Sequence, residues 1–298
     1  MAIELQLAAH DKDLGGGFTV RRLLPAARRR SVGPFIFFDH FGPVTVPPGT
    51  NYDVRPHPHI GLATVTYLFD GAMMHRDSLG NQQLIEPGAI NWMTSGHGIV
   101  HSERGPEHLR GRAHVSHGLQ LWTALPREHE QDDPSFVHTP SAAIPQVQVG
   151  DARVRVLVGQ AFGAASPVTT LCPTLYLDVM LAPGGRLELT ALAPELAVYA
   201  VQGEVFVGAQ AVSPWSMAVL EPGAPAAVSA ARAARFVLIG GDPLDGPRHM
   251  WWNFVASDRE RILRASADWE AQRMGKVPGD DEFIPLPPAR FAPPEPIS

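Results

Sequence analysis

The chain has 298 residues, of which 45% are hydrophobic and 18% are charged. This size and composition are typical of one or two globular domains with real cores and exclude a disordered chain. The formal net charge of −6 argues against direct nucleic-acid binding, which depends on neutralising phosphates. The single cysteine, Cys172, excludes an internal disulfide and a thiolate-rich zinc site.

The N-terminal residues and the apolar runs of the chain indicate where in the cell the protein is expected. The first residues have no basic region followed by an apolar core, so no signal peptide is expected. No apolar run is long enough to cross a bilayer. We therefore expect a cytoplasmic protein without a membrane partner.

Short β-branched and aromatic runs follow one another along the chain, separated by glycine and proline. Many short strands with regular turn signals are typical of antiparallel sandwiches and barrels, not of a parallel α/β sheet. We therefore predict an all-β fold. The predicted strands include Phe35–Phe38, Thr64–Phe69, Val154–Val158, Leu175–Leu181, Ala197–Val201, Val205–Val207 and Phe236–Ile239.

One strong helix signal comes late in the chain. Ser257 and Glu260 have the spacing of a capping box. Apolar residues follow at helical spacing until Gly275, which predicts a helix over 257–274. The proline-rich stretch 277–298 is predicted to be an extended strap or tail.

The two halves of the chain contain a weak internal repeat. Tyr67–Gly71 matches Tyr199–Gly203, and Leu84–Gly88 matches Val219–Gly223. The repeat predicts two similar domains, 1–140 and 141–298, the second including the helix and the tail. These matches align positions 57, 59, 101 and 103 with Leu189, Ala191, Phe236 and Leu238, so metal-ligand side chains are expected in the first domain alone.

Four potential metal ligands form two tight pairs, His57-Pro58-His59 and His101-Ser102-Glu103. In a strand, residues i and i+2 project from the same face, so two such strands can direct three imidazoles and one carboxylate to one point. Pro56 and Pro58 leave an alternative open, because polyproline geometry would turn the first pair apart. The donor set favours Fe(II), while Mn, Ni, Cu and Zn are chemically allowed.

Several motifs, taken together, resemble the pirin family of the cupin superfamily. They are Phe38–Pro43, Arg55–Gly61, His75–Gly80, Gly96–Glu103 and, near the end, Gly279–Leu286. The resemblance implies a bicupin, with two jelly-roll β-barrels in one chain and an iron-type site in the N-terminal barrel only. It also implies the metal ligands His57, His59, His101 and Glu103. Thr64 stands where other cupins have a glutamate, and Glu103 supplies the carboxylate, as in pirins.

The resemblance implies two classes of function. The first is a quercetin 2,3-dioxygenase-like enzyme that acts on a small aromatic, flavonol-type substrate with O₂. In it Glu103 is a metal ligand and a candidate base for the phenolic proton. The second is a non-enzymatic, metal-dependent regulator that binds a transcription factor or a metabolic enzyme. We favour the enzyme. His97 is either an orienting residue or an ordinary loop histidine. His75, Arg76 and Asp77 either line the barrel mouth or, as we favour, form a turn network.

Overall fold

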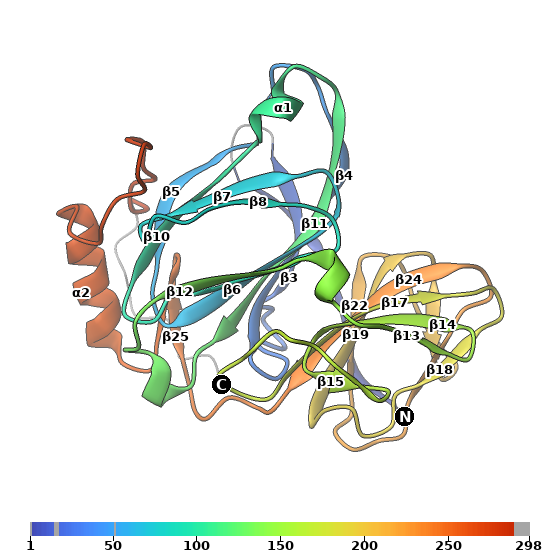
Figure 1. Ribbon diagram of the computed structural model, residues 1–298. Coiled ribbons are helices and arrows are strands. Elements are labelled where there is room, and N and C mark those ends of the chain that lie inside the picture. Colours follow the sequence, from blue (N-terminus) through green and yellow to red (C-terminus); the bar gives the residue numbers. More distant parts are fainter. Residues whose placement is uncertain (1, 15–17, 51, 289–298) are drawn as a thin grey trace. The chain divides into compact units, whose positions relative to one another are not determined.

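The computed structural model describes residues 2–14, 18–50 and 52–288. Strands make up most of its regular structure (Figure 1). The chain divides into two compact units: unit 1 comprises 1–12, 21–39 and 142–243, and unit 2 comprises 13–20, 40–141 and 244–298. Each unit thus combines segments from both halves of the sequence. The predicted domains, 1–140 and 141–298, are continuous stretches, and that division stays a prediction.

Unit 1 contains two antiparallel sheets. The larger has the order β1-β22-β19-β24-β17-β14-β13, and the smaller has the order β18-β23-β20-β21. The larger sheet consists of β1 (Ile3–Ala8), β22 (Ser216–Leu220), β19 (Glu195–Gln202), β24 (Ala234–Gly241), β17 (Thr174–Leu181), β14 (Ala152–Val158) and β13 (Gln146–Val149). The smaller consists of β18 (Arg186–Glu188), β23 (Ala227–Ser229), β20 (Val205–Val207) and β21 (Gln210–Val212); β15 (Gln160–Ala161) and β16 (Ala164–Ala165) form a separate pair.

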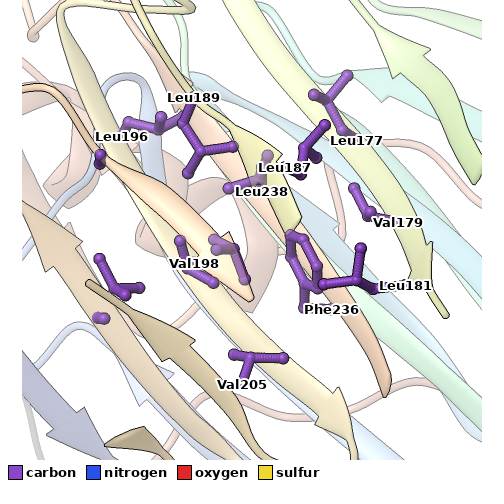
Figure 2. Packing of buried hydrophobic residues seen from close by; sticks show 14 of the residues in the cluster. Leu177, Val179, Leu181, Leu187, Leu189, Leu196, Val198, Val205, Phe236 and Leu238 are labelled. Carbon is purple, nitrogen blue, oxygen red and sulfur yellow. The ribbon is translucent and has the colours of Figure 1, made fainter. Parts of the chain in front are cut away.

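The core of unit 1 is apolar. Alternate residues of β17, among them Leu177, Val179 and Leu181, pack with Phe236 and Leu238 of β24, as Figure 2 shows. All five side chains are at most 2% exposed. Alternation with period two places these residues on one face of their strands, which explains why the sequence pattern predicted strands here.

Unit 2 repeats this arrangement. Its larger sheet has the consecutive order β12-β9-β6-β11-β4, and its smaller sheet has the order β5-β10-β7-β8. The larger sheet uses β12 (Ser135–Thr139), β9 (Ile90–Thr94), β6 (Leu62–Asp70), β11 (His114–Ala124) and β4 (Phe35–Val46). β3 (Thr19–Leu24) and β2 (His10–Asp13) come after β4 in the same strand order, but most of their residues belong to unit 1. The smaller uses β5 (Val54–His59), β10 (Ile99–Arg104), β7 (Met73–Asp77) and β8 (Gln82–Ile85).

The predicted all-β architecture with an internal repeat is confirmed, with one correction to the barrels. Among the described residues, the strand orders begin and end at edge strands, so the sheets are open and are not closed barrels. The strand orders also correct part of the alignment. The counterpart of β10 is β23, not the segment around Phe236, which lies in β24, the counterpart of β11. The Glu-Pro-Gly motif misled the alignment because it precedes β9 in one half and follows β22 in the other.

The predicted late helix is present as α2 (Arg259–Glu270). Its N-cap is Asp258, one residue after the expected Ser257, and it ends at Glu270, four residues before the predicted end. The Asp258 carboxylate accepts the Glu260 amide, whereas the amide and hydroxyl of Ser257 donate to Glu130. Ile262 and Trp269 are buried, as the spacing predicted, but Leu263 is 41% exposed. The residues of the predicted tail from 289 to 298 lie outside the described residues.

The remaining short elements of the described chain are β25 (His249–Trp251), β26 (Phe254–Ala256), α1 (Glu107–Arg110) and two 3₁₀ turns, Arg127–His129 and Ser141–Ala143. In unit 2, α2 packs on β26, and the two share a cluster with Ile60 and Val100. None of the helices formed by the described residues is long and apolar enough to span a bilayer.

A buried ion-pair network fixes the segment that precedes α2. Glu130 is 2% exposed and its carboxylate lies 2.9 Å from Nε of Arg248 and 3.0 Å from an amino group of Arg261. The Arg248 side chain is fully buried and also pairs with Asp245. Glu130 thus contacts two guanidinium groups that have little access to water, and Asp245 supplies the second negative charge.

Glu130→Ala is expected to destabilise the protein by about 3–5 kcal/mol, because removing one partner of a buried ion pair leaves an uncompensated charge. The measurement is the urea midpoint of unfolding followed by tryptophan fluorescence. Glu128→Ala is the matched control: its side chain is 82% exposed, so a change of at most about 0.5 kcal/mol is expected. Equal midpoints for the two variants would show that the network does not contribute to stability.

Candidate metal centre

The pairing of β5 with β10 brings three histidines of unit 2 together. The strands are antiparallel neighbours, and His101 lies directly opposite His57, while Ile99 lies opposite His59. His57 and His59 share one face of β5 because they are two residues apart. One ring nitrogen from each of the three histidines lies within 4.8 Å of the other two. The ring centroids of His57 and His101 are 4.3 Å apart.

The prolines around His57 do not turn the first pair apart. β5 runs through Pro56 and Pro58, and it is the edge strand of its sheet. An edge strand needs hydrogen bonds on one side only, so it tolerates residues that lack an amide proton. Of the two geometries that the sequence left open, the extended strand is the one observed.

Backbone carbonyls orient two of the imidazoles. Nδ1 of His57 donates to the carbonyl of Arg55 at 2.9 Å, and Nδ1 of His59 donates to the carbonyl of Asn253 at 3.1 Å. A carbonyl can only accept, so both rings carry their proton on Nδ1 and keep the Nε2 lone pair for another partner. This is the outer-shell arrangement typical of histidines that bind metals.

The surroundings of His101 show whether the three histidines suit a metal. Its side chain is buried, and neither ring nitrogen has a hydrogen-bond partner among the described residues. A buried polar group without a partner is costly, and most such groups in proteins are satisfied. A divalent cation among the three imidazoles would give one of these two nitrogens a partner. The residues present therefore fit a metal.

Burial also keeps the three rings in the form that binds metals. It lowers the pKa of His57 to about 4. Burial, with the neighbouring imidazoles, lowers the pKa of His59 and His101 well below the usual range. The cause is that a protonated ring loses its hydration in the interior. The neutral imidazole is the metal ligand.

Glu103 lies next to this cluster but outside it. Its carboxylate does not belong to the group of ligand atoms that lie within 4.8 Å of one another. The pairing of β10 with β5 shifts between His101 and Glu103, so that Glu103 lies opposite Val54. Burial raises the pKa of Glu103 to about 7. A nearby cation would favour the ionised form of this buried carboxyl group.

His75 lies closer to the cluster than the favoured turn-network interpretation predicts. Asp77 forms the expected turn network: it accepts the amides of Leu79 and Asn81 and the Nε2 proton of His75, the last at 2.9 Å. β7, however, also pairs with β10, so the His75 ring centroid lies 5.3 Å from that of His101. Nothing in the sequence indicates which strand β7 joins, and therefore the proximity was not predictable from spacing.

His97 is not brought to the cluster. Its side chain is 51% exposed and lies 3.3 Å from the Asp133 carboxylate. It borders a cavity of about 440 Å³ whose lining includes Arg261, Arg264 and Arg273. None of the three clustered histidines lines this cavity.

A small hollow of about 40 Å³ reaches Glu103. Its lining residues include the apolar Phe18, Tyr52, Val46 and Met73, together with Glu103. Phe18 and Tyr52 are stacked, with centroids 5.0 Å apart and planes 23° apart. His57 is 7% and Glu103 9% exposed, against 1% for His59 and His101. Of the four predicted ligands, Glu103 alone lines this hollow.

The repeated pairs of sheets and the histidine cluster define a two-domain β-protein of the cupin class, and comparison with known proteins specifies the family. Residues 17–123 match the Pirin family model, and residues 176–275 match the Pirin C-terminal cupin domain. The chain belongs to the pirin family, and the predicted bicupin organisation is confirmed.

Individual relatives cover nearly the whole chain. A pirin-like protein of Caulobacter vibrioides is 47% identical over 96% of this chain and 99% of its own length. A Pseudomonas aeruginosa protein provisionally named a quercetin 2,3-dioxygenase is 38% identical over 89% of this chain and 83% of its own. The crystal structure of a quercetin 2,3-dioxygenase from Acinetobacter baumannii superposes with a TM-score of 0.91 at 34% identity, covering 99% of this chain and 98% of the other.

Metal removal and His101→Ala are expected to have the same effect on stability. A metal that binds only the folded protein raises its stability by about 2.7 kcal/mol at a concentration 100 times the Kd. We expect Fe(II) or Ni(II) to raise the Tm of the wild-type protein but not of His101→Ala, measured by differential scanning fluorimetry under argon. Without metal, the wild type and His101→Ala should both still be folded and show a cooperative unfolding transition. The reason is that the core of unit 1 contains none of the three histidines.

His97→Ala is the matched control, since this histidine lies outside the cluster. It should keep the full metal-dependent rise in Tm. A rise in Tm that survives in His101→Ala would mean that the metal binds elsewhere.

Proposed function

We propose that this protein is a metal-dependent dioxygenase with quercetin 2,3-dioxygenase-like activity, and that His57, His59, His101 and Glu103 hold its Fe(II). One observation carries the proposal: three buried, neutral imidazoles converge, and one of them has no hydrogen-bond partner among the described residues. The likeness to the Acinetobacter baumannii quercetin 2,3-dioxygenase over 99% of the chain supports it.

The donor set favours iron. Three nitrogens and one oxygen, without thiolate, suit Fe(II), although Mn, Ni, Cu and Zn accept the same donors. When bound, the metal would supply Lewis acidity that favours the ionised form of a flavonol hydroxyl. Among the described residues, Glu103 is the nearest acidic position along the ligand strand, two residues beyond His101 on β10.

In this scheme Glu103 is the general base that accepts the 3-hydroxyl proton of the flavonol. A flavonol must lose its 3-hydroxyl proton before it can bind as an anion, and Glu103 lines the small hollow that reaches the ligand strand. A carboxylate oxygen within hydrogen-bond reach of the hydroxyl would accept that proton. Burial of Glu103 also limits the competition of water for the same position.

The aromatic lining suits an aromatic substrate. Phe18 and Tyr52 present ring surfaces to the hollow, and Val46 and Met73 add apolar contact. A volume of about 40 Å³ is, however, far below the roughly 300 Å³ typical of small-molecule sites. A flavonol therefore requires the lining to move, and we expect the stacked pair of Phe18 and Tyr52 to be the part that separates.

The same small volume favours a second candidate function. A metal-dependent regulator that binds a transcription factor or a metabolic enzyme needs no substrate cavity. In that case the site would bind a metal and change the protein's surface without turnover. The two candidates differ in whether oxygen is consumed.

Oxygen uptake distinguishes them. Anaerobically prepared protein with stoichiometric Fe(II) is mixed with quercetin and O₂, and oxygen consumption is recorded with an electrode while carbon monoxide is trapped. We expect uptake that depends on the metal. Glu103→Gln should lower kcat by at least about 100-fold, the smaller end of the usual contribution of a general base.

His97→Ala serves as control and should retain wild-type turnover. No uptake by wild-type protein that carries stoichiometric metal would reject the dioxygenase and favour the regulator.

Tyr52→Ala tests whether the stacked rings of Phe18 and Tyr52 must separate before a flavonol can enter. If the stacked pair must separate, removing one ring should tighten quercetin binding several-fold, because a larger fraction of the protein is then open to the ligand. Catechol, which has a single ring, should gain less. The measurement is fluorescence quenching with metal-loaded protein; Tyr52→Phe, which keeps the ring, should bind as the wild type does. Weaker binding to Tyr52→Ala would instead show that the ring holds the substrate.

A further inference from the structure

Arg104, the residue after Glu103, joins three acidic side chains of unit 2. Its guanidinium contacts both carboxylate oxygens of Asp280, at 2.7 and 3.0 Å. It also lies 2.7 Å from Glu282 and 3.4 Å from Asp53. The side chains of Arg104 and Asp280 are only 13% and 7% exposed, whereas that of Glu282 is 59% exposed. The pair with Asp280 is thus the shielded part of the network.

The network spans the point where the backbone pairing is irregular. β10 and β5 are in register from Ile99 to His101, and the register then shifts before Glu103. A bulge leaves a residue unpaired and re-aims the side chains around it. The ladder with β5 therefore fixes His101 relative to His57 but does not fix Glu103 relative to β5; on the other side of β10, Glu103 is paired in register with His75 of β7. Asp53 bridges this gap: it accepts the Gly105 amide at 2.7 Å and contacts Arg104 just before β5 begins.

The other partner, Asp280, belongs to a strap that is attached to β5. The Ile284 amide donates to the carbonyl of Pro56 at 2.8 Å, next to His57. The Ile284 carbonyl in turn accepts the indole proton of Trp269 in α2 at 2.9 Å. Val277, at the start of the strap, is 2% exposed. The strap is thus held at both ends of the segment that contains Asp280.

We propose that the Arg104–Asp280 ion pair sets the position of Glu103 relative to His57, His59 and His101, so that Arg104 and Asp280 are positioning residues of the metal centre. Alternation along β10 directs Arg104 and Glu103 to opposite faces. The contact of Arg104 with the strap therefore fixes β10 on the face opposite to Glu103, while Glu103 faces the cluster. This inference rests on the proposed function, because it takes Glu103 to be a ligand.

The test is a double-mutant cycle on metal affinity. The Kd for Ni(II) is measured by anaerobic titration calorimetry for the wild type, Asp280→Asn, Glu103→Gln and the double variant. Losing an outer-shell partner typically lowers metal affinity by about 10–100-fold, and this loss is expected for Asp280→Asn. If Asp280 acts through Glu103, the double variant should bind no more weakly than Glu103→Gln, within about twofold.

Controls separate positioning from a general loss of structure. Asp281→Asn makes the same change of charge at the next, exposed residue and should leave the Kd within about twofold of the wild type. Asp280→Glu restores the charge and should recover part of the affinity. If Asp280→Asn yields no folded protein, Asp53→Asn probes the same network from the other strand and should show the same non-additivity with Glu103→Gln.

The outcomes separate this inference from the proposed function. Wild-type affinity in Asp280→Asn beside a weakened Glu103→Gln would overturn the positioning role alone. Losses that add in the double variant would do the same, since Asp280 would then act independently of Glu103. Unchanged affinity in Glu103→Gln would remove Glu103 from the ligands and overturn both.

Discussion

The antiparallel pairing of β5 with β10 is the interaction on which the site depends. Placing His101 opposite His57 converts two pairs that are distant in sequence into one cluster. Side chains alternate along a strand, so a slip of one residue would exchange the faces and point Ser102 or Pro58 inward instead. The register is therefore the constraint that the other contacts of the centre preserve.

Several of those contacts come from the end of the chain. The Asn253 carbonyl orients His59, and Ile284 bonds to the backbone beside His57. Both lie in the part of unit 2 that follows residue 243. The buried Glu130 network holds the beginning of that part, at Arg248. The His59 imidazole thus acquires its orientation only when a segment from the far end of the chain has docked, whereas His57 is oriented locally by Arg55.

The sequence was informative about residue types and local geometry, and less so about partners. Residues i and i+2 in a strand share a face whatever the fold, so the His57–His59 pair could be predicted from spacing alone. The Phe236 alignment failed because a turn motif recurs at different points of the two halves, and turn chemistry is local. The bulge before Glu103 and the proximity of His75 depend on which strands pair, and that is decided by long-range packing that no local pattern encodes.

The repeat shows that the architecture itself does not require a metal. In unit 1, the strands equivalent to β5 and β10 are β18 and β23, and their inward residues Leu187 and Val228 are at most 1% exposed within the apolar core. Hydrophobic side chains therefore fill the same topological position without any ligand. In unit 2 that position contains three buried imidazoles, an arrangement that lowers stability unless a cation occupies it. The same chain fills this position with leucine and valine in unit 1 and with histidine in unit 2. The stability that the histidines cost is offset by the binding of a metal. The cluster therefore serves function rather than folding.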